Sequence, residues 1–171
     1  MVILSQPDTA ELSRAPAPPA EAATRVLRRF RVVFNAVKTH FQQVEKAAGI
    51  GGAQLWALSL IRDHGGIGVG ELAKAMDVHQ STASNLVKVL IDRELVAATK
   101  DGVDKRKVQL QLRPSGLRLL DRAPGPFAGL LPQALEALDA ETLRRLDQDL
   151  ARLIALLDAD PEAARIPLGQ L

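Results

Sequence analysis

The sequence predicts a mainly α-helical protein with one small β-hairpin, in the order four helices, two strands and two further helices. Apolar residues recur at three- and four-residue steps through most of the chain, which is typical of helices that bury one face. Strict alternation of apolar and polar residues occurs around 108–112, as expected for a strand. The 171 residues make about one domain, and a composition of 47% hydrophobic and 25% charged residues is ordinary for a globular protein.

The N-terminal part of the chain divides into a tail and a long helix. Residues 1–20 are rich in proline and lack apolar periodicity, so we predict a flexible tail there. Residues 21–48 are predicted to form a helix that ends at a glycine-rich stretch, 49–52. The apolar face of this helix comprises Val26, Phe30, Val33, Phe34, Val37, Phe41 and Val44.

Three shorter helices are predicted next. The first covers 53–63 and ends before Gly65, since glycine takes the left-handed conformation at a helix C-terminus without steric cost. The second covers 69–77 and the third covers 80–93, with a tight turn between them. The inward face of the third is predicted to be Ala83, Leu86, Val87, Leu90 and Ile91.

The second half of the chain begins with the hairpin. We predict strands at 95–100 and 108–112 around a polar turn, and then a helix from Pro114 to about residue 122. Pro124, Pro126 and Pro132 interrupt the following stretch. The last helix is predicted for 140–158 with Asp139 as its N-cap, and residues 159–171 for a tail. Its apolar stripe comprises Leu143, Leu146, Leu150, Leu153, Ile154 and Leu157.

Two short helices, a tight turn and a hairpin constitute a winged helix-turn-helix, whose second helix enters the DNA major groove. The outward residues of the 80–93 helix, Gln80, Ser81, Ser84, Asn85 and Lys88, suit that role. Together with the neighbouring short side chain of Thr82 they are the predicted DNA contacts of this helix, which we call the reading row. The amides of Gln80 and Asn85 donate and accept hydrogen bonds, as bidentate reading of adenine requires. The alternative is an ordinary solvated face, but such faces usually carry Glu/Lys pairs, and residues 79–88 contain no acid.

The hairpin is a second predicted DNA contact, through Lys100, Asp104, Lys105 and Arg106. The net charge is only +2, yet residues 79–113 hold seven basic and four acidic residues, whereas residues 136–162 hold three arginines and eight acids. Positive charge is therefore concentrated where phosphate contacts are predicted. An arginine at the tip of a hairpin suits a narrow minor groove. The alternative is an ordinary charged turn.

Four stretches of this sequence resemble the MarR family of transcriptional regulators (multiple antibiotic resistance type). They are the run from Gly70 to Leu90, the pair Leu95-Val96, the pattern Asp101-x-x-Asp-Lys-Arg106, and the pattern Leu110-x-Leu-x-Pro-x-Gly116. The resemblance is strongest over 53–116 and extends over about 21–158. The Asp-x-Arg of Asp104 and Arg106 is its most specific part.

The resemblance implies a dimer that reads a pseudo-palindromic operator in double-stranded DNA. Residues 53–113 would form the DNA-binding domain, and residues 21–48 and 114–158 the helical dimerisation region. Arg106 would enter the minor groove and Asp104 would brace it. The chain departs from the family pattern at Glu94, where glycine is common, and at Arg113, where the family has threonine. The prolines after residue 122 imply a broken or kinked fifth helix.

Homodimerisation is also expected from the apolar stripes at 26–44 and 143–157. A chain with only 3% aromatic residues would leave such stripes exposed if it stayed alone. A two-fold axis between two copies would cover them and match two half-sites about 34–36 Å apart. The alternative is that the stripes pack within one chain.

The resemblance further implies a small effector, often an aromatic or phenolic acid, in a cleft beside the DNA-binding part. Candidate contacts are Phe34, His40, Trp56 and Arg62, in which the guanidinium would pair a carboxylate. The alternative places Phe34 and Trp56 in the core and His40 and Arg62 on the surface.

Several classes of function are disfavoured. The absence of cysteine excludes disulfides, cysteine-type zinc sites, iron–sulfur clusters and cysteine nucleophiles. The three histidines lack metal-ligand spacing, and the glycines at 65–70 have neither a preceding strand nor a following Lys-Ser/Thr. The sequence has no recognisable catalytic set and no apolar run of ~20 residues, and the pattern of its first residues leads us to expect no secretory signal. We expect a cytoplasmic protein that is not an enzyme and uses no cofactor or membrane.

The functional hypothesis is therefore a sequence-specific, homodimeric DNA-binding regulator, a repressor that a small ligand releases from its operator. The alternative is a winged-helix protein-interaction module that does not bind DNA. That alternative predicts apolar residues in place of the reading row, and the row is polar.

Overall fold

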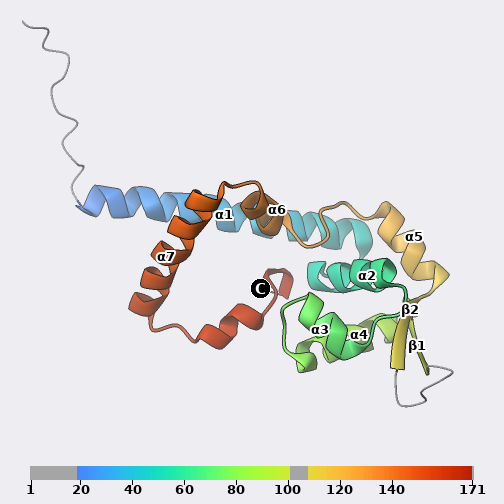
Figure 1. Ribbon diagram of the computed structural model, residues 1–171. Coiled ribbons are helices and arrows are strands. Elements are labelled where there is room, and N and C mark those ends of the chain that lie inside the picture. Colours follow the sequence, from blue (N-terminus) through green and yellow to red (C-terminus); the bar gives the residue numbers. More distant parts are fainter. Residues whose placement is uncertain (1–18, 101–107, 171) are drawn as a thin grey trace, which may run out of the picture. The chain divides into compact units, whose positions relative to one another are not determined.

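The computed structural model describes residues 19–100 and 108–170, which form seven α-helices, two strands and two 3-10 helices (Figure 1). The helices are α1 (Pro19–Ala48), α2 (Gly52–His64), α3 (Val69–Ala75), α4 (Gln80–Asp92), α5 (Pro114–Arg122), α6 (Leu130–Glu136) and α7 (Ala140–Leu157). The strands are β1 (Val96–Lys100) and β2 (Val108–Leu112), and the 3-10 helices are η2 (Pro161–Arg165) and η3 (Leu168–Gln170).

The chain separates into two compact units, residues 1–35 and 36–171. The described part of the first unit is the N-terminal portion of α1, where Phe30 and Phe34 stack with ring centroids 6.2 Å apart. The second unit begins within α1 and contains all the remaining elements.

The helix ends follow from local sequence chemistry. Gly65 adopts a left-handed conformation (φ 58°, ψ 35°) at the C-cap of α2, as predicted. Asp139 caps α7, accepting a hydrogen bond from the backbone N–H of Thr142 at 2.9 Å, and Pro114 occupies the first turn of α5. Glu71 accepts a hydrogen bond from the backbone N–H of Gly68 at 3.0 Å and so satisfies a free donor at the start of α3.

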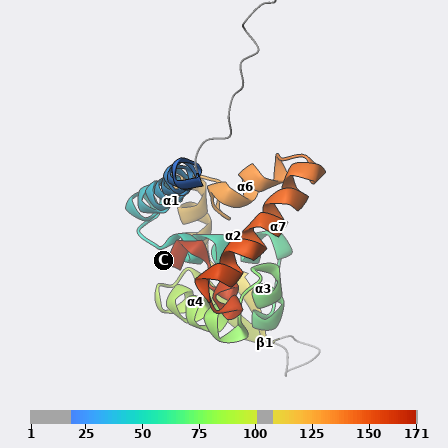
Figure 2. The same ribbon diagram turned by 90° about the vertical axis from the view of Figure 1, so that its left-hand side faces the viewer.

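The core of the 36–171 unit lies where α2, α3, α4 and the hairpin meet. Its largest fully buried side chains are Val44, Leu55, Leu58, Ile61, Leu72, Leu90, Val96 and Leu110. In Figures 1 and 2, α3 and α4 lie next to each other below α2. The α4 helix therefore has one face against the core and leaves the other free.

The hairpin is antiparallel, with Val96 opposite Leu112 and Lys100 opposite Val108. A third segment joins it, because the backbone N–H of Leu110 donates to the carbonyl of Ile67 at 2.9 Å. The predicted strand pair is confirmed. The bridge at Ile67 was not predicted, because a single bridging residue between two helices is too short to show a periodic pattern.

The structure differs from the sequence-based expectation in three places. Ile91, predicted to face inward, is 37% exposed because it lies at the edge of the apolar face near the end of α4. The interrupted stretch after α5 contains the additional helix α6, which begins after Gly129. Residues 159–171, expected to form a tail, include η2 and η3, and Pro167 is buried.

No helix in residues 19–100 or 108–170 is both long and apolar enough to cross a lipid bilayer.

Candidate nucleic-acid interface

The turn between α3 and α4 is short and tightly hydrogen bonded. The backbone N–H of Asp77 donates to the carbonyl of Lys74 at 3.1 Å, and that of Val78 donates to the carbonyl of Ala73 at 3.0 Å. Asp77 has a φ of 51°, a left-handed conformation that aspartate tolerates better than most residues. His79 then caps α4, and its carbonyl accepts from the N–H of Ala83 at 3.1 Å.

The two faces of α4 separate as predicted over its first three turns. Ala83, Leu86, Val87 and Leu90 are buried. The opposite face carries most of the reading row: Gln80, Ser81, Ser84, Asn85 and Lys88 are exposed, and Thr82 is half-buried. The six predicted positions thus lie on one helix, at or beside its exposed face.

The chemistry of that face is polar with little charge. Ser84 donates its hydroxyl to the carbonyl of Gln80 at 2.7 Å, which still leaves its oxygen as an acceptor. Asp92, the last residue of α4, is its single acidic residue, and Lys88 is its single basic one. Over residues 80–88 the exposed face therefore offers hydrogen-bond donors and acceptors and contains no acidic residue of its own.

The β1–β2 hairpin and its connecting turn are the wing of the winged helix-turn-helix, and the structure describes only some of the DNA contacts predicted there. Lys100 is the last residue of β1, and the register places its backbone opposite Val108. Asp104, Lys105 and Arg106 lie outside the described residues. Their roles stay predictions.

Comparison with known proteins decides the family. The sequence profile of the MarR family matches residues 48–107. The HTH-type transcriptional repressor NicR of Pseudomonas putida is 36% identical over 115 residues, which is 67% of this chain and 71% of NicR. The chain belongs to the MarR family. The proteins of this family are transcriptional regulators. A second similar protein is the HTH-type transcriptional repressor MdtR of Bacillus subtilis, which is 22% identical over 130 residues. The match covers 76% of this chain and 84% of MdtR.

Solved structures agree with the MarR fold. YusO of Bacillus subtilis is similar with a TM-score of 0.51 and 22% identity, covering 81% of this chain and 98% of YusO. A mutant MarR of E. coli, complexed with operator DNA, has a TM-score of 0.50 and 19% identity, covering 76% of this chain and 96% of that one. At these identities the likeness establishes the winged-helix fold.

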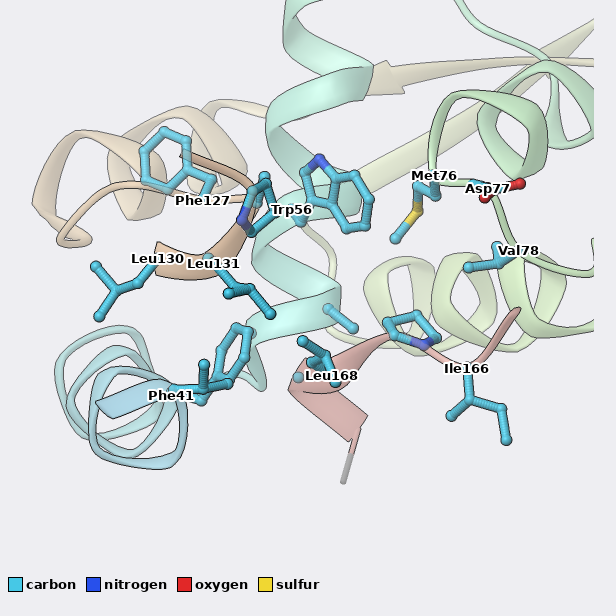
Figure 3. A pocket seen from close by; sticks show the side chains of 18 of the residues that line it. Phe41, Trp56, Met76, Asp77, Val78, Phe127, Leu130, Leu131, Ile166 and Leu168 are labelled. Atoms are coloured by element: carbon cyan, nitrogen blue, oxygen red, sulfur yellow. The ribbon is translucent and has the colours of Figure 1, made fainter. Parts of the chain in front are cut away.

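A pocket of about 210 Å³ adjoins the helix-turn-helix of this MarR-family chain (Figure 3). Its walls come from the second half of α1, from α2, from the α3–α4 turn, from residues 127–132, and from residues 164 and 166–169. The labelled side chains in Figure 3 are mostly apolar, with Trp56 of α2 among them. The single ionisable residue among the described lining residues is Asp77, whose carboxylate points away from Trp56 in Figure 3.

The four predicted effector residues have different surroundings. Trp56 lines the pocket. Arg62 is exposed, pairs with Asp63 at 2.8 Å and lies 5.7 Å from the ring centre of Phe127, which is a pocket residue. His40 is 6% exposed, and its Nε2 lies 3.1 Å from the carbonyl oxygen of Pro126.

Phe34, the fourth candidate, is 61% exposed and belongs to the 1–35 unit. Sequence reasoning also missed part of the pocket wall, namely the residues around Gly129, Ala164 and residues 166–169. The apolar run Ile166-Pro167-Leu168 is the signal in the sequence that could have indicated packing there.

In residues 19–100 and 108–170 there is no group of three or more His, Asp or Glu side chains arranged to hold a metal ion.

Proposed function

We propose that this protein is a sequence-specific, homodimeric DNA-binding repressor that inserts α4 into the major groove of its operator. The observation that carries the proposal is the exposed side of α4 over residues 80–88, which contains no acidic residue and on which Gln80, Ser81, Ser84 and Asn85 present hydrogen-bonding groups. Such groups match the donor and acceptor pattern of base edges. Membership of the MarR family and the similarity to the repressors NicR and MdtR support the same function.

Under this proposal residues 53–113 are the DNA-binding domain, and residues 21–48 and 114–158 form the dimerisation region. Lys88 contacts phosphate, as do Lys100 and Lys105 of the wing. Arg106 enters the minor groove, where the electrostatic potential is most negative, and Asp104 holds it extended.

The dimer is supported by apolar side chains that each unit leaves uncovered. In the 1–35 unit, Val32 is 69% exposed and Phe34 is 61% exposed. In the 36–171 unit, α7 has no buried residue, and Leu156 and Leu157 are 85% and 65% exposed. A second copy of the chain would remove these side chains from water, which the hydrophobic effect favours.

The effector is proposed to be a small molecule bound beside Trp56. A cavity of about 210 Å³ suits a compact ring system, and its apolar walls suit the face of a ring. A candidate cation for an aromatic acid is Arg62, which lies 5.7 Å from the ring centre of the pocket residue Phe127. An aromatic acid would therefore draw Arg62 away from Asp63, whereas a neutral aromatic compound would not.

The second candidate function is a winged-helix protein-interaction module that does not bind DNA. Such a module needs an apolar docking face. On the described surface of α4, Ile91 is the one exposed large apolar residue, and it lies beyond the reading row.

The deciding experiment is selection of bound duplexes from random DNA by the purified full chain. We expect a pseudo-palindromic consensus with half-sites about one helical turn apart. Repeating the selection with benzoic acid, a hydroxylated pyridine carboxylic acid and a neutral phenol then tests the effector. Recovery of no enriched sequence would refute the DNA-reading role of α4.

A further inference from the structure

The C-terminal residues 158–170, which we call the C-terminal strap, run from the end of α7 back to α2. Asp158 takes a left-handed conformation (φ 49°) at the end of α7. Asp160 then accepts a hydrogen bond from the backbone N–H of Glu162 at 3.0 Å and starts η2. In both Figure 1 and Figure 2 the C-terminal end lies beside α2.

The strap packs closely on α2. Pro167 is buried. A Cβ atom on Gly169 would lie 2.9 Å from the backbone nitrogen of Ala53 and 3.0 Å from Cε1 of Phe41. Only glycine fits at that distance without a shift of the backbone, so the docked position is defined by shape.

The docked strap connects the pocket to the start of α4. Pro167 and Leu168 line the same cavity as Trp56. Toward the other end of the strap, Oε2 of Glu162 lies 3.1 Å from Nε2 of His79 and 3.8 Å from Nε of Arg165. His79 is the N-cap of α4 and directly precedes Gln80.

We propose that the C-terminal strap is an autoinhibitory element that weakens DNA binding while it is docked. The N-terminus of α4, with the ring nitrogen of His79 beside it, favours a phosphate group. The docked strap places the carboxylate of Glu162 3.1 Å from that ring nitrogen, where it competes with phosphate for the same position. This inference rests on the proposed function, since it requires α4 to bind DNA.

The geometry also gives the proposed effector a route to the DNA-reading helix. A small molecule beside Trp56 contacts Pro167 and Leu168 only while the strap is docked. It therefore binds the docked state more tightly and shifts the population toward it. By linkage, the same preference lowers affinity for DNA, which is the direction required for release of a repressor.

The first test replaces the carboxylate without changing the shape of the side chain. Glu162→Gln is expected to raise affinity for a mixed-sequence duplex at low salt about two- to fivefold, the range expected for one exposed charge. The gain should shrink as salt is added, because the charge is exposed. The matched control is Glu136→Gln, which removes the same charge from the end of α6 and should leave affinity unchanged.

The second test displaces the strap with a substitution that changes none of its charged residues. Gly169→Val forces a side chain against Ala53 and should undock the strap. Emission of Trp56, the single tryptophan of the sequence, should then shift to longer wavelength, and DNA affinity should rise as for Glu162→Gln. Circular dichroism confirms that the helices persist in each variant.

The outcomes separate the two proposals. If the wild-type chain and every variant fail to bind any duplex, the proposed function is wrong and the autoinhibition proposal falls with it. If all bind DNA but Glu162→Gln behaves like Glu136→Gln, the proposed function stands and the strap is not inhibitory. Equal affinity of Gly169→Val and wild type, together with a shifted Trp56 emission, would equally overturn the inhibitory role.

Discussion

At the residue scale, the absence of a Cβ atom at Gly116 allows α5 to lie close to the residues that precede β1. This residue is buried in α5, and a Cβ atom there would lie 2.5 Å from the backbone carbonyl oxygen of Leu95. The last turn before β1 and the first turn of α5 are also joined by the Ser115 hydroxyl, which donates to the carbonyl of Glu94. A methyl group cannot be accommodated without moving that backbone.

We predict that Gly116→Ala destabilises the protein by about 1–3 kcal/mol, although alanine has the higher helix propensity. Overpacking against a carbonyl oxygen outweighs the gain in propensity. Urea unfolding measures the change, with Gly70→Ala as the control because Gly70 has open space around its Cα. Equal midpoints for the two variants would contradict this account.

Asn85 is the residue at which base reading is most directly testable. Its amide is exposed on α4, and an amide that donates and accepts discriminates one base pair from another. We predict that Asn85→Ala relaxes sequence preference by ~1–3 kcal/mol at one position in each half-site.

Lys88→Ala is the comparison for Asn85→Ala, because Lys88 is expected to contact phosphate. It should weaken binding to all duplexes alike and lower the salt dependence by about one counterion. Binding titrations on the selected operator and on single-base variants distinguish the two patterns. A uniform loss for Asn85→Ala would reassign Asn85 as a phosphate contact.

At the element scale, the start of α7 depends on a single capping residue. The backbone N–H and the hydroxyl of Thr142 both donate to the Asp139 carboxylate, at 2.9 Å and 2.7 Å. These hydrogen bonds lower the pKa of Asp139 below its ordinary value of 3.8. Because the folded pKa is depressed, the stabilisation is present above pH 3.8 and is lost as the pH falls through the folded value.

We predict that Asp139→Ala unwinds the first turn of α7 at neutral pH, whereas Asp139→Asn, which keeps an acceptor oxygen, retains most of it. Neither variant has a carboxylate at position 139 whose protonation could weaken the helix cap. Each should therefore lose less helicity than wild type as the pH falls below 4. Circular dichroism from pH 7 to pH 2 measures this. An unchanged acid response would show that Asp139 does not stabilise α7.

The wing is the second element with a prediction of its own. Arg106→Ala should weaken operator binding strongly and leave the dimer intact, since the side chain is proposed to contact DNA rather than protein. Gel-shift titration gives the affinity, and light scattering after size exclusion gives the mass. Undiminished affinity would rule out a minor-groove role for Arg106.

At the scale of the whole molecule, the uncovered apolar face of α7 makes a prediction about assembly. Leu156 is 85% exposed and is expected to be covered by a second copy of the chain. We predict that Leu156→Lys halves the mass measured by light scattering and lowers operator affinity, because two half-sites are then no longer bound together. Ile91→Lys on α4 is the control for an exposed apolar residue outside that face, and its mass should equal that of the dimer. A wild-type chain that is already monomeric would refute the proposal.

Local sequence patterns determined the helices α1 to α5 and α7, the strand β2 with its alternating apolar and polar residues, the N-cap at Asp139 and the exposed face of α4. Each of these depends on residues within a few positions of one another, so the 3.6- and 2-residue periods are sufficient to predict it. The edge position of Ile91 shows the limit of periodicity, because coverage by neighbouring elements decides whether the last turn of a helix is buried.

Only the tertiary structure decided the pocket beside Trp56, the bridge from Ile67 to Leu110 and the contact of Glu162 with His79. These features join segments that are tens of residues apart, and the C-terminal stretch has no periodic pattern from which its packing partner could be predicted. From the sequence, residues 159–171 were expected to be a tail, although the run Ile166-Pro167-Leu168 is apolar. Which surface it covers was settled by shape, because Gly169 is what allows the strap to approach Ala53 and Phe41 so closely.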